Sequence, residues 1–184
     1  MKGINKIAMI VTKILEIAHW VAVGFMAAVL ICSAAAPGWL GVFLEMDVSE
    51  NGWELSTYGF EVAAANSAGE VNMTTVLLFS IGALIILSLI AMVFRNLYLI
   101  IKKSNGTTPF QKDNIRMLRE IGIFSISIPV VGLIMSIIIR LIVGVEAAET
   151  SVNLSGFIMG IIVLCLTQYF THGADIEKDV DGLV

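Results

Sequence analysis

Four long apolar segments alternate with charged stretches along this 184-residue chain. They cover about residues 12–35, 75–98, 121–143 and 152–172. Each approaches the roughly 20 apolar residues that a helix needs to cross about 30 Å of hydrocarbon. The chain has 58% hydrophobic and 14% charged residues. A chain this short and this apolar cannot bury all of its hydrophobic side chains in the core of a water-soluble domain. We therefore predict an all-α integral membrane protein with four transmembrane helices, forming one domain over 1–184.

The charged residues are segregated between the connections. Residues 36–73 contain six acids and no Lys or Arg, whereas residues 95–119 contain six Lys or Arg and one acid. Cytoplasmic loops of membrane proteins keep Lys and Arg, and translocated loops lack them. The pattern predicts that 95–119 and both termini are cytoplasmic and that the 36–73 loop is outside. Arg140, near the outer end of the third span, is an exception that we expect to reach the membrane surface or to pair with Glu146 or Glu149.

The inner connection, 99–120, is predicted to be a helical hairpin. Asn105-Gly106 is a helix stop, because glycine accepts the left-handed conformation after a helix end. Thr108 is expected to cap a second helix that starts at Pro109, with Gln111 completing the capping box. The hairpin is basic, which predicts contact with anionic lipid head groups or with an acidic partner. Its candidate contact residues are Lys102, Lys103, Lys112, Arg116 and Arg119.

The outer loop is predicted to contain a small β-hairpin between spans 1 and 2. Residues 42–48 and 53–58 both alternate apolar and polar side chains, and Asn51-Gly52 between them is a strong hairpin turn signal. The expected pairs are Val48 with Leu55 and Met46 with Thr57, with Trp53 on the same face. The acids of this loop either bind cations or a cationic peptide, or are simply solvated.

Polar residues within the spans form a candidate inner-leaflet cluster. Ionisable residues in spans usually face the bundle and have partners. The cluster is either a ligand, proton-sensing or metal site, or a structural polar layer in which Glu16 pairs with Arg95. We prefer the structural interpretation, because neither the i, i+3 nor the i, i+4 spacing is a ligand signature by itself. The candidate residues are Glu16, His19, Arg95, Gln168 and His172.

No motif points to catalysis. The chain lacks HExxH, GxSxG, CxxC and P-loop patterns, so we expect no enzyme activity, catalytic residue, metal or cofactor. A membrane enzyme with a metal at His19 and His172 is the alternative we rank last. Gly156 and Gly160 match GxxxG on the fourth span. This pattern serves either homo-oligomers or close packing within one bundle, and we prefer packing.

The inner connection and the chain end resemble a family of small bacterial four-span membrane proteins catalogued as domain of unknown function 2975. The resemblance extends over nearly the whole length, although Asp179 stands where that pattern more often has Glu, and the outer loop does not contribute. It implies a bacterial cytoplasmic membrane protein, often encoded beside a small helix-turn-helix regulator, with no established activity. The matching residues are Gly106-Thr-Thr-Pro109-Phe110, Asn114, Leu118, Arg119 and Gly122, then Gly173, Ile176, Asp179, Asp181 and Val184.

These observations favour a non-enzymatic membrane regulatory or sensory protein. It would couple an envelope signal to a cytosolic partner such as a helix-turn-helix regulator, without binding nucleic acid directly. The alternative is a small transporter or an immunity protein against a membrane-active peptide. We also expect the acidic tail, 173–184, either to pack near Lys112, Arg116 and Arg119 or to be independently solvated.

Overall fold

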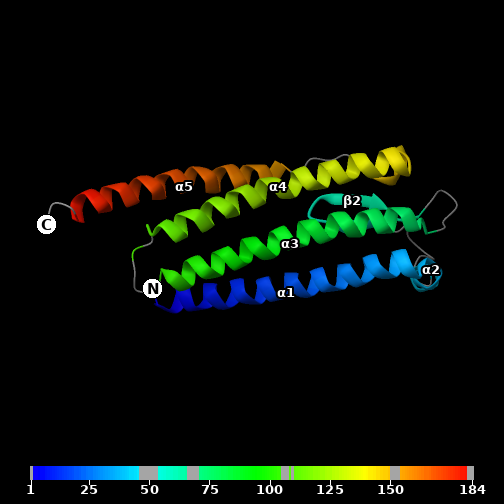
Figure 1. Cartoon of the computed structure of the whole chain (residues 1–184), viewed down its shortest axis with the longest axis horizontal. Helices are drawn as coiled ribbons and strands as arrows, with labels where there is room; N and C mark the ends of the chain where they lie inside the picture. The colour runs from blue at the N-terminus through cyan, green and yellow to red at the C-terminus, as the bar shows by residue number, and fades with distance from the viewer. Residues whose placement is uncertain are drawn as a thin grey trace. The chain divides into compact units, whose positions relative to one another are not determined.

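The computed structural model describes residues 2–45, 54–65, 71–104, 108, 110–149 and 154–181. These residues form five α-helices, a two-stranded sheet and a short 3-10 helix (Figure 1). In chain order the elements are α1 (Lys2–Ala35), α2 (Pro37–Glu45), β1 (Glu54–Thr57), β2 (Phe60–Ala63), α3 (Met73–Lys103), α4 (Lys112–Ile142), η1 (Val145–Ala147) and α5 (Leu154–Asp181).

Four of the helices, α1, α3, α4 and α5, are long and apolar enough to cross a membrane, which confirms the predicted helix content. α3 and α4 have 31 residues each. At 1.5 Å per residue they are about 46 Å long, against about 30 Å of hydrocarbon. The apolar part of α3 is 44% buried, whereas that of α1 is 6% buried. α1 therefore leaves most of its apolar surface for a surrounding lipid phase.

The contacts divide the chain into two compact units. Unit 1 comprises Met1–His19, Leu89–Ser127 and Leu154–Val184, and unit 2 comprises Trp20–Ser88 and Ile128–Asn153. α1, α3 and α4 thus contribute to both units. The β-hairpin belongs to unit 2, and α5 belongs to unit 1.

The predicted small β-hairpin is present in unit 2, but its position differs from the prediction. β1 pairs antiparallel with β2, so that Leu55 lies opposite Val62 and Thr57 lies opposite Phe60. Val48 and Met46, the partners expected for Leu55 and Thr57, lie outside the described residues. The two-residue turn is Tyr58-Gly59, with φ of 48° and 84°. Positive φ at both positions matches the right-handed twist of the strands. The predicted tip, Asn51-Gly52, and Trp53 lie outside the described residues.

Helix α2 contradicts the first part of the predicted strand over residues 42–48, and the rest of that strand lies outside the described residues. Residues 42–45 are helical rather than extended. Pro37 opens α2 at the position where its fixed φ suits a helix and its missing N–H has no cost. Leu40, only 7% exposed, packs in a cluster with Ala64 and Val76. Burial of the α2 face therefore overrides the local alternation of apolar and polar residues.

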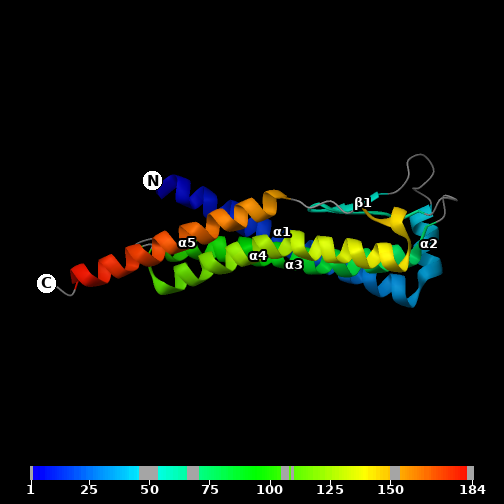
Figure 2. The same cartoon turned by 90° about the horizontal axis from the view of Figure 1, so that it is seen from above.

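Phe60 of β2 anchors the hairpin to α3 within unit 2. Figures 1 and 2 show the hairpin running along this helix. Its side chain is fully buried, and its ring stacks on that of Phe79 of α3 with centroids 5.2 Å apart. Close approach requires glycine at position 82, where a Cβ atom would lie 2.7 Å from the Phe60 ring. The hairpin also contacts the residues after α4, through a bridge between Val62 and Ala148.

In unit 1, α4 and α5 pack through glycines. A Cβ atom at Gly160 would clash with Ile126 and lie 2.9 Å from the Gly122 carbonyl oxygen, and one at Gly122 would lie 2.7 Å from Leu164. Gly160 of the GxxxG pattern therefore serves packing within the chain. α4 begins at Lys112, not at Pro109 as predicted, and then runs to Ile142 without a break.

Candidate functional site

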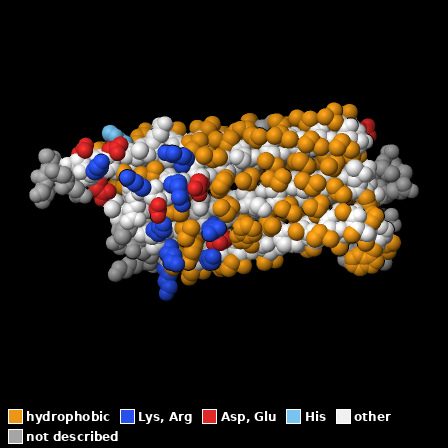
Figure 3. Space-filling view, viewed as in Figure 1, with side chains coloured by type: hydrophobic (Ala, Val, Ile, Leu, Met, Phe, Trp, Pro, Cys, Tyr) orange, Lys and Arg blue, Asp and Glu red, His pale blue; other side chains and the backbone are white. Residues whose placement is uncertain are grey.

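The positive charges of the chain gather in unit 1. Arg140 is the only one of the 11 Lys and Arg residues that falls in unit 2, which holds eight of the 15 acids. Figure 3 shows many of the Lys and Arg side chains of unit 1 exposed together on one face. This clustering makes the connection between α3 and α4, with the helix ends beside it, the strongest candidate for an interaction site.

All five predicted contact residues of the connection are exposed. Lys112, Arg116 and Arg119 are spaced i, i+4 and i+7, so they lie on one face of α4. Lys103 pairs with Asp113, and Arg116 pairs with Glu120. Neither Lys112 nor Arg119 forms an ion pair with any residue in the described ranges. We call the exposed surface of these five residues the basic face.

Both ends of the connection are fixed to each other. Lys103 Nζ donates to Asp113 Oδ2 at 2.7 Å, and Asn114 Nδ2 donates to Ser104 Oγ at 3.3 Å. Asn114 is only 2% exposed, so its hydrogen bond has little competition from water. The end of α3 and the start of α4 are therefore held in one geometry beneath the basic face.

Helix α5 holds the middle of the connection. Phe110 packs against α5, with its ring centroid 5.5 Å from that of Phe170. A Cβ atom at Gly173 would lie 2.8 Å from the Phe110 ring, so the absence of a side chain there makes room for the phenyl group. Thr108 Oγ1 donates to Glu177 Oε2 at 3.0 Å and accepts the Phe110 amide at 3.1 Å. We call these contacts the Phe110 latch.

The acidic tail thus packs on the connection by a different route from the expected one. α5 continues as a helix to Asp181, and its described contacts with the connection are made to Thr108 and Phe110. The expected ion pairs with Lys112, Arg116 and Arg119 are absent among the described side chains, where Arg116 instead binds Glu120. An aromatic side chain filling a glycine notch fixes the tail more specifically than exposed ion pairs would.

Two members of the predicted inner-leaflet cluster have partners outside it. Glu16 is only 8% exposed and pairs with Lys13 at 3.0 Å rather than with Arg95. The His19 ring lies 5.2 Å from that of Phe94, and its Nδ1 lies 2.7 Å from the Leu15 carbonyl oxygen. That carbonyl can only accept, so Nδ1 carries the hydrogen.

The remaining members, Arg95, Gln168 and His172, are exposed. No cluster of three or more His, Cys, Asp or Glu side chains suitable for a metal ion occurs in the described ranges. The buried polar contact of this region joins Asn96, 4% exposed, to Glu120, with Asn96 Nδ2 donating to Oε2 at 2.9 Å. Sequence analysis missed Glu120 as a site residue, although a carboxylate at the start of an apolar run is a signal for a paired group.

No protein-family model matches the chain, and no curated protein or solved structure is significantly similar to it.

Proposed function

We propose that the chain is a non-enzymatic regulatory or sensory protein of a bacterial cytoplasmic membrane, with both termini and the basic face in the cytoplasm. It couples a signal from the envelope side to a cytosolic partner, such as the helix-turn-helix regulator that the family resemblance implies. The division of Lys and Arg between the two units supports this orientation, because positively charged segments stay inside.

The observation that carries the proposal is the basic face on a fixed connection. Lys112 precedes the uncharged segment that begins at Ile121 by nine residues, which is about 14 Å along a helix. The head-group layer is only about 5–8 Å thick on each side. Lys112 therefore extends past the lipid head groups into water, where a soluble partner can reach it. Since Lys112 and Arg119 form no ion pair with the described residues, an acidic partner has no such ion pair of theirs to displace.

Binding of a purified helix-turn-helix regulator, taken from the neighbouring gene that the family resemblance implies, tests this function. The full chain is held in nanodiscs, and affinity is compared for the unmodified protein, Lys112→Glu, and Lys6→Glu as a control with the same charge change on another exposed lysine. We expect Lys112→Glu to weaken binding by about tenfold or more, because like charges across an interface repel. Lys6→Glu should leave binding nearly unchanged. No binding by the unmodified chain, or equal losses in both variants, would contradict the proposal.

A further inference from the structure

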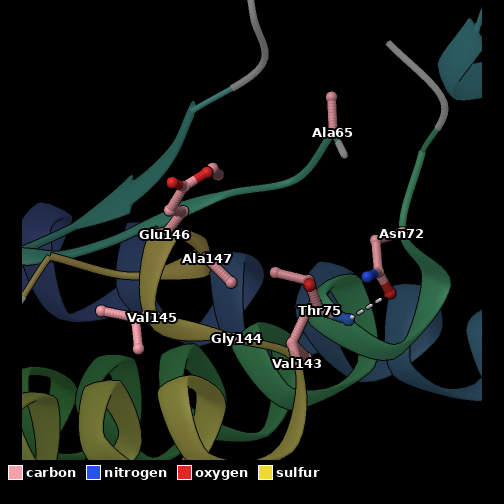
Figure 4. A pocket seen from close by; sticks show the side chains of 9 residues that line it. Ala65, Asn72, Thr75, Val143, Gly144, Val145, Glu146 and Ala147 are labelled. Carbon is pink, nitrogen blue, oxygen red and sulfur yellow. Dashed lines mark hydrogen bonds between the residues drawn. The ribbon is translucent and has the colours of Figure 1, made fainter. Parts of the chain in front are cut away.

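A cavity of about 610 Å³ lies within unit 2, where the chain enters α3 (Figure 4). Its volume is in the range of about 300–1,000 Å³ that is usual for small-molecule sites. Its lining comes from the end of β2 and the residues after it, from the start of α3, and from the turn that follows α4. The lining residues are Ala63, Ala65, Asn72, Thr75 and the five residues Val143–Ala147.

Thr75 provides an unsatisfied polar group at this cavity. Its side chain is fully buried, and its Oγ1 atom has no hydrogen-bond partner among the described residues. Other helix hydroxyls of this chain, such as that of Ser80, donate to the carbonyl four residues earlier. Thr75 lies in the first turn of α3, where no helical carbonyl is present four residues back. Figure 4 shows its side chain pointing from α3 toward the 143–147 turn.

The cavity is unsuited to an anion. A helix start usually attracts anions through its unpaired N–H groups. Here the Asn72 side-chain oxygen already accepts the amides of Thr74 and Thr75, at 3.1 and 3.3 Å. The nearby Arg140 does not line the cavity and donates to the Ala148 carbonyl oxygen at 3.3 Å. Among the described residues of the lining, the exposed Glu146 is the only charged one, in a unit that has eight acids against one cation.

We propose that this cavity binds a small organic cation that carries a primary ammonium group on a short apolar body. The Glu146 carboxylate and the Thr75 hydroxyl accept hydrogen bonds from the ammonium, and Ala63, Ala65 and Val143 contact the apolar part. Such a group occurs on simple amines and at the N-terminus of a peptide. That this cation is the signal sensed on the outer side rests on the proposed sensory function. Binding of the cation to the cavity does not.

A titration with n-butylammonium tests the binding site separately from partner docking. The full chain is held in nanodiscs of zwitterionic lipid, and the amide resonance of Gly144 is followed by NMR. Glu146→Gln is compared with Glu149→Gln, which removes the same charge from an exposed position outside the lining. We expect a saturable shift that Glu146→Gln weakens by about tenfold or more and Glu149→Gln leaves nearly unchanged, because only the first variant removes the negative charge that pairs with the ammonium and turns a charge-assisted hydrogen bond into a neutral one.

Thr75→Val examines the hydroxyl at nearly constant volume. We expect it to raise the thermal unfolding midpoint without ligand, because a buried unsatisfied hydroxyl is removed, and to weaken butylammonium binding several-fold. No saturable shift in the unmodified chain, equal binding of butyrate, equal effects of Glu146→Gln and Glu149→Gln, or unchanged affinity in Thr75→Val would each overturn the proposal. These outcomes leave docking of the regulator at the basic face unaffected, so failure of one proposal is distinguishable from failure of the other.

Discussion

Gly173 determines whether the Phe110 latch can close, because a Cβ atom there would lie 2.8 Å from the Phe110 ring. We predict that Gly173→Val displaces the ring and frees the connection, at a cost of about 1–3 kcal/mol for overpacking. Limited trypsin digestion measures this as faster cleavage after Lys112, since cleavage follows the population of the opened segment. Gly3→Val is the control, because nothing lies within 4 Å of that position. Equal cleavage rates in both variants would show that the latch does not hold the connection.

The Asn96–Glu120 hydrogen bond makes a second prediction for single residues. Asn96→Ala removes the donor from Glu120 Oε2, and we expect the protein in detergent to lose about 1 kcal/mol, the size of polar contacts between membrane helices. Glu120→Gln keeps an acceptor for Asn96 and should lose less. Thermal unfolding of both variants gives the comparison, and a larger loss in Glu120→Gln would assign the stabilisation to the Arg116–Glu120 pair instead.

For pairs of helices, the glycine contact between α4 and α5 gives a third prediction. Gly160→Val should force the helices apart and lower the unfolding midpoint, because its side chain would meet Ile126 and the Gly122 carbonyl oxygen. Gly24→Val, with no atom within 4 Å, is the control in another apolar helix. If GxxxG instead served a homodimer, Gly160→Val would halve the particle mass in light scattering and leave the midpoint unchanged.

The helices show which elements can be predicted from the sequence. α1, α3, α4 and α5 follow from apolar length alone, because a span needs about 20 apolar residues whatever its neighbours are. The sequence predicts a hairpin in this loop from the local Asn51-Gly52 signal, which lies outside the described residues. The described hairpin turns at Tyr58-Gly59, next to the buried Phe60, and this depends on packing that a local signal does not report. Partial burial in this turn raises the pKa of the Tyr58 phenol above its ordinary value.

The candidate sites were harder to predict than the helices, because they depend on which residues meet. The exposure of Lys112 and Arg119 follows from charge and position. Other features depend on contacts between or within elements, which the periodicity of the sequence does not report. They are the pairing of Glu16 with Lys13, the space for the Phe110 ring at Gly173, and the unsatisfied hydroxyl of Thr75. For the same reason Arg95, Gln168 and His172 look like a cluster by sequence position and are exposed in the structure.

For the whole molecule, the account depends on the sidedness of the two units. Unit 1 holds the basic face, and unit 2 holds the hairpin, the cavity and most of the acids. If unit 1 were outside, the basic face could not meet a cytosolic regulator and the cavity could not receive an envelope signal. Regulator docking at the basic face and sensing of a cation by the cavity therefore require the same topology in the cell. Binding of the regulator or of butylammonium to the purified chain does not depend on that topology.

Labelling of single cysteines tests this topology most directly. Lys112→Cys and Glu54→Cys, both at exposed positions, are made separately after Cys32 and Cys165 are replaced by alanine. An impermeant maleimide is applied to intact spheroplasts and to lysed ones. The account predicts that position 54 is labelled in both samples and that position 112 is labelled only after lysis. Labelling of position 112 with protection of position 54 in intact spheroplasts would contradict it.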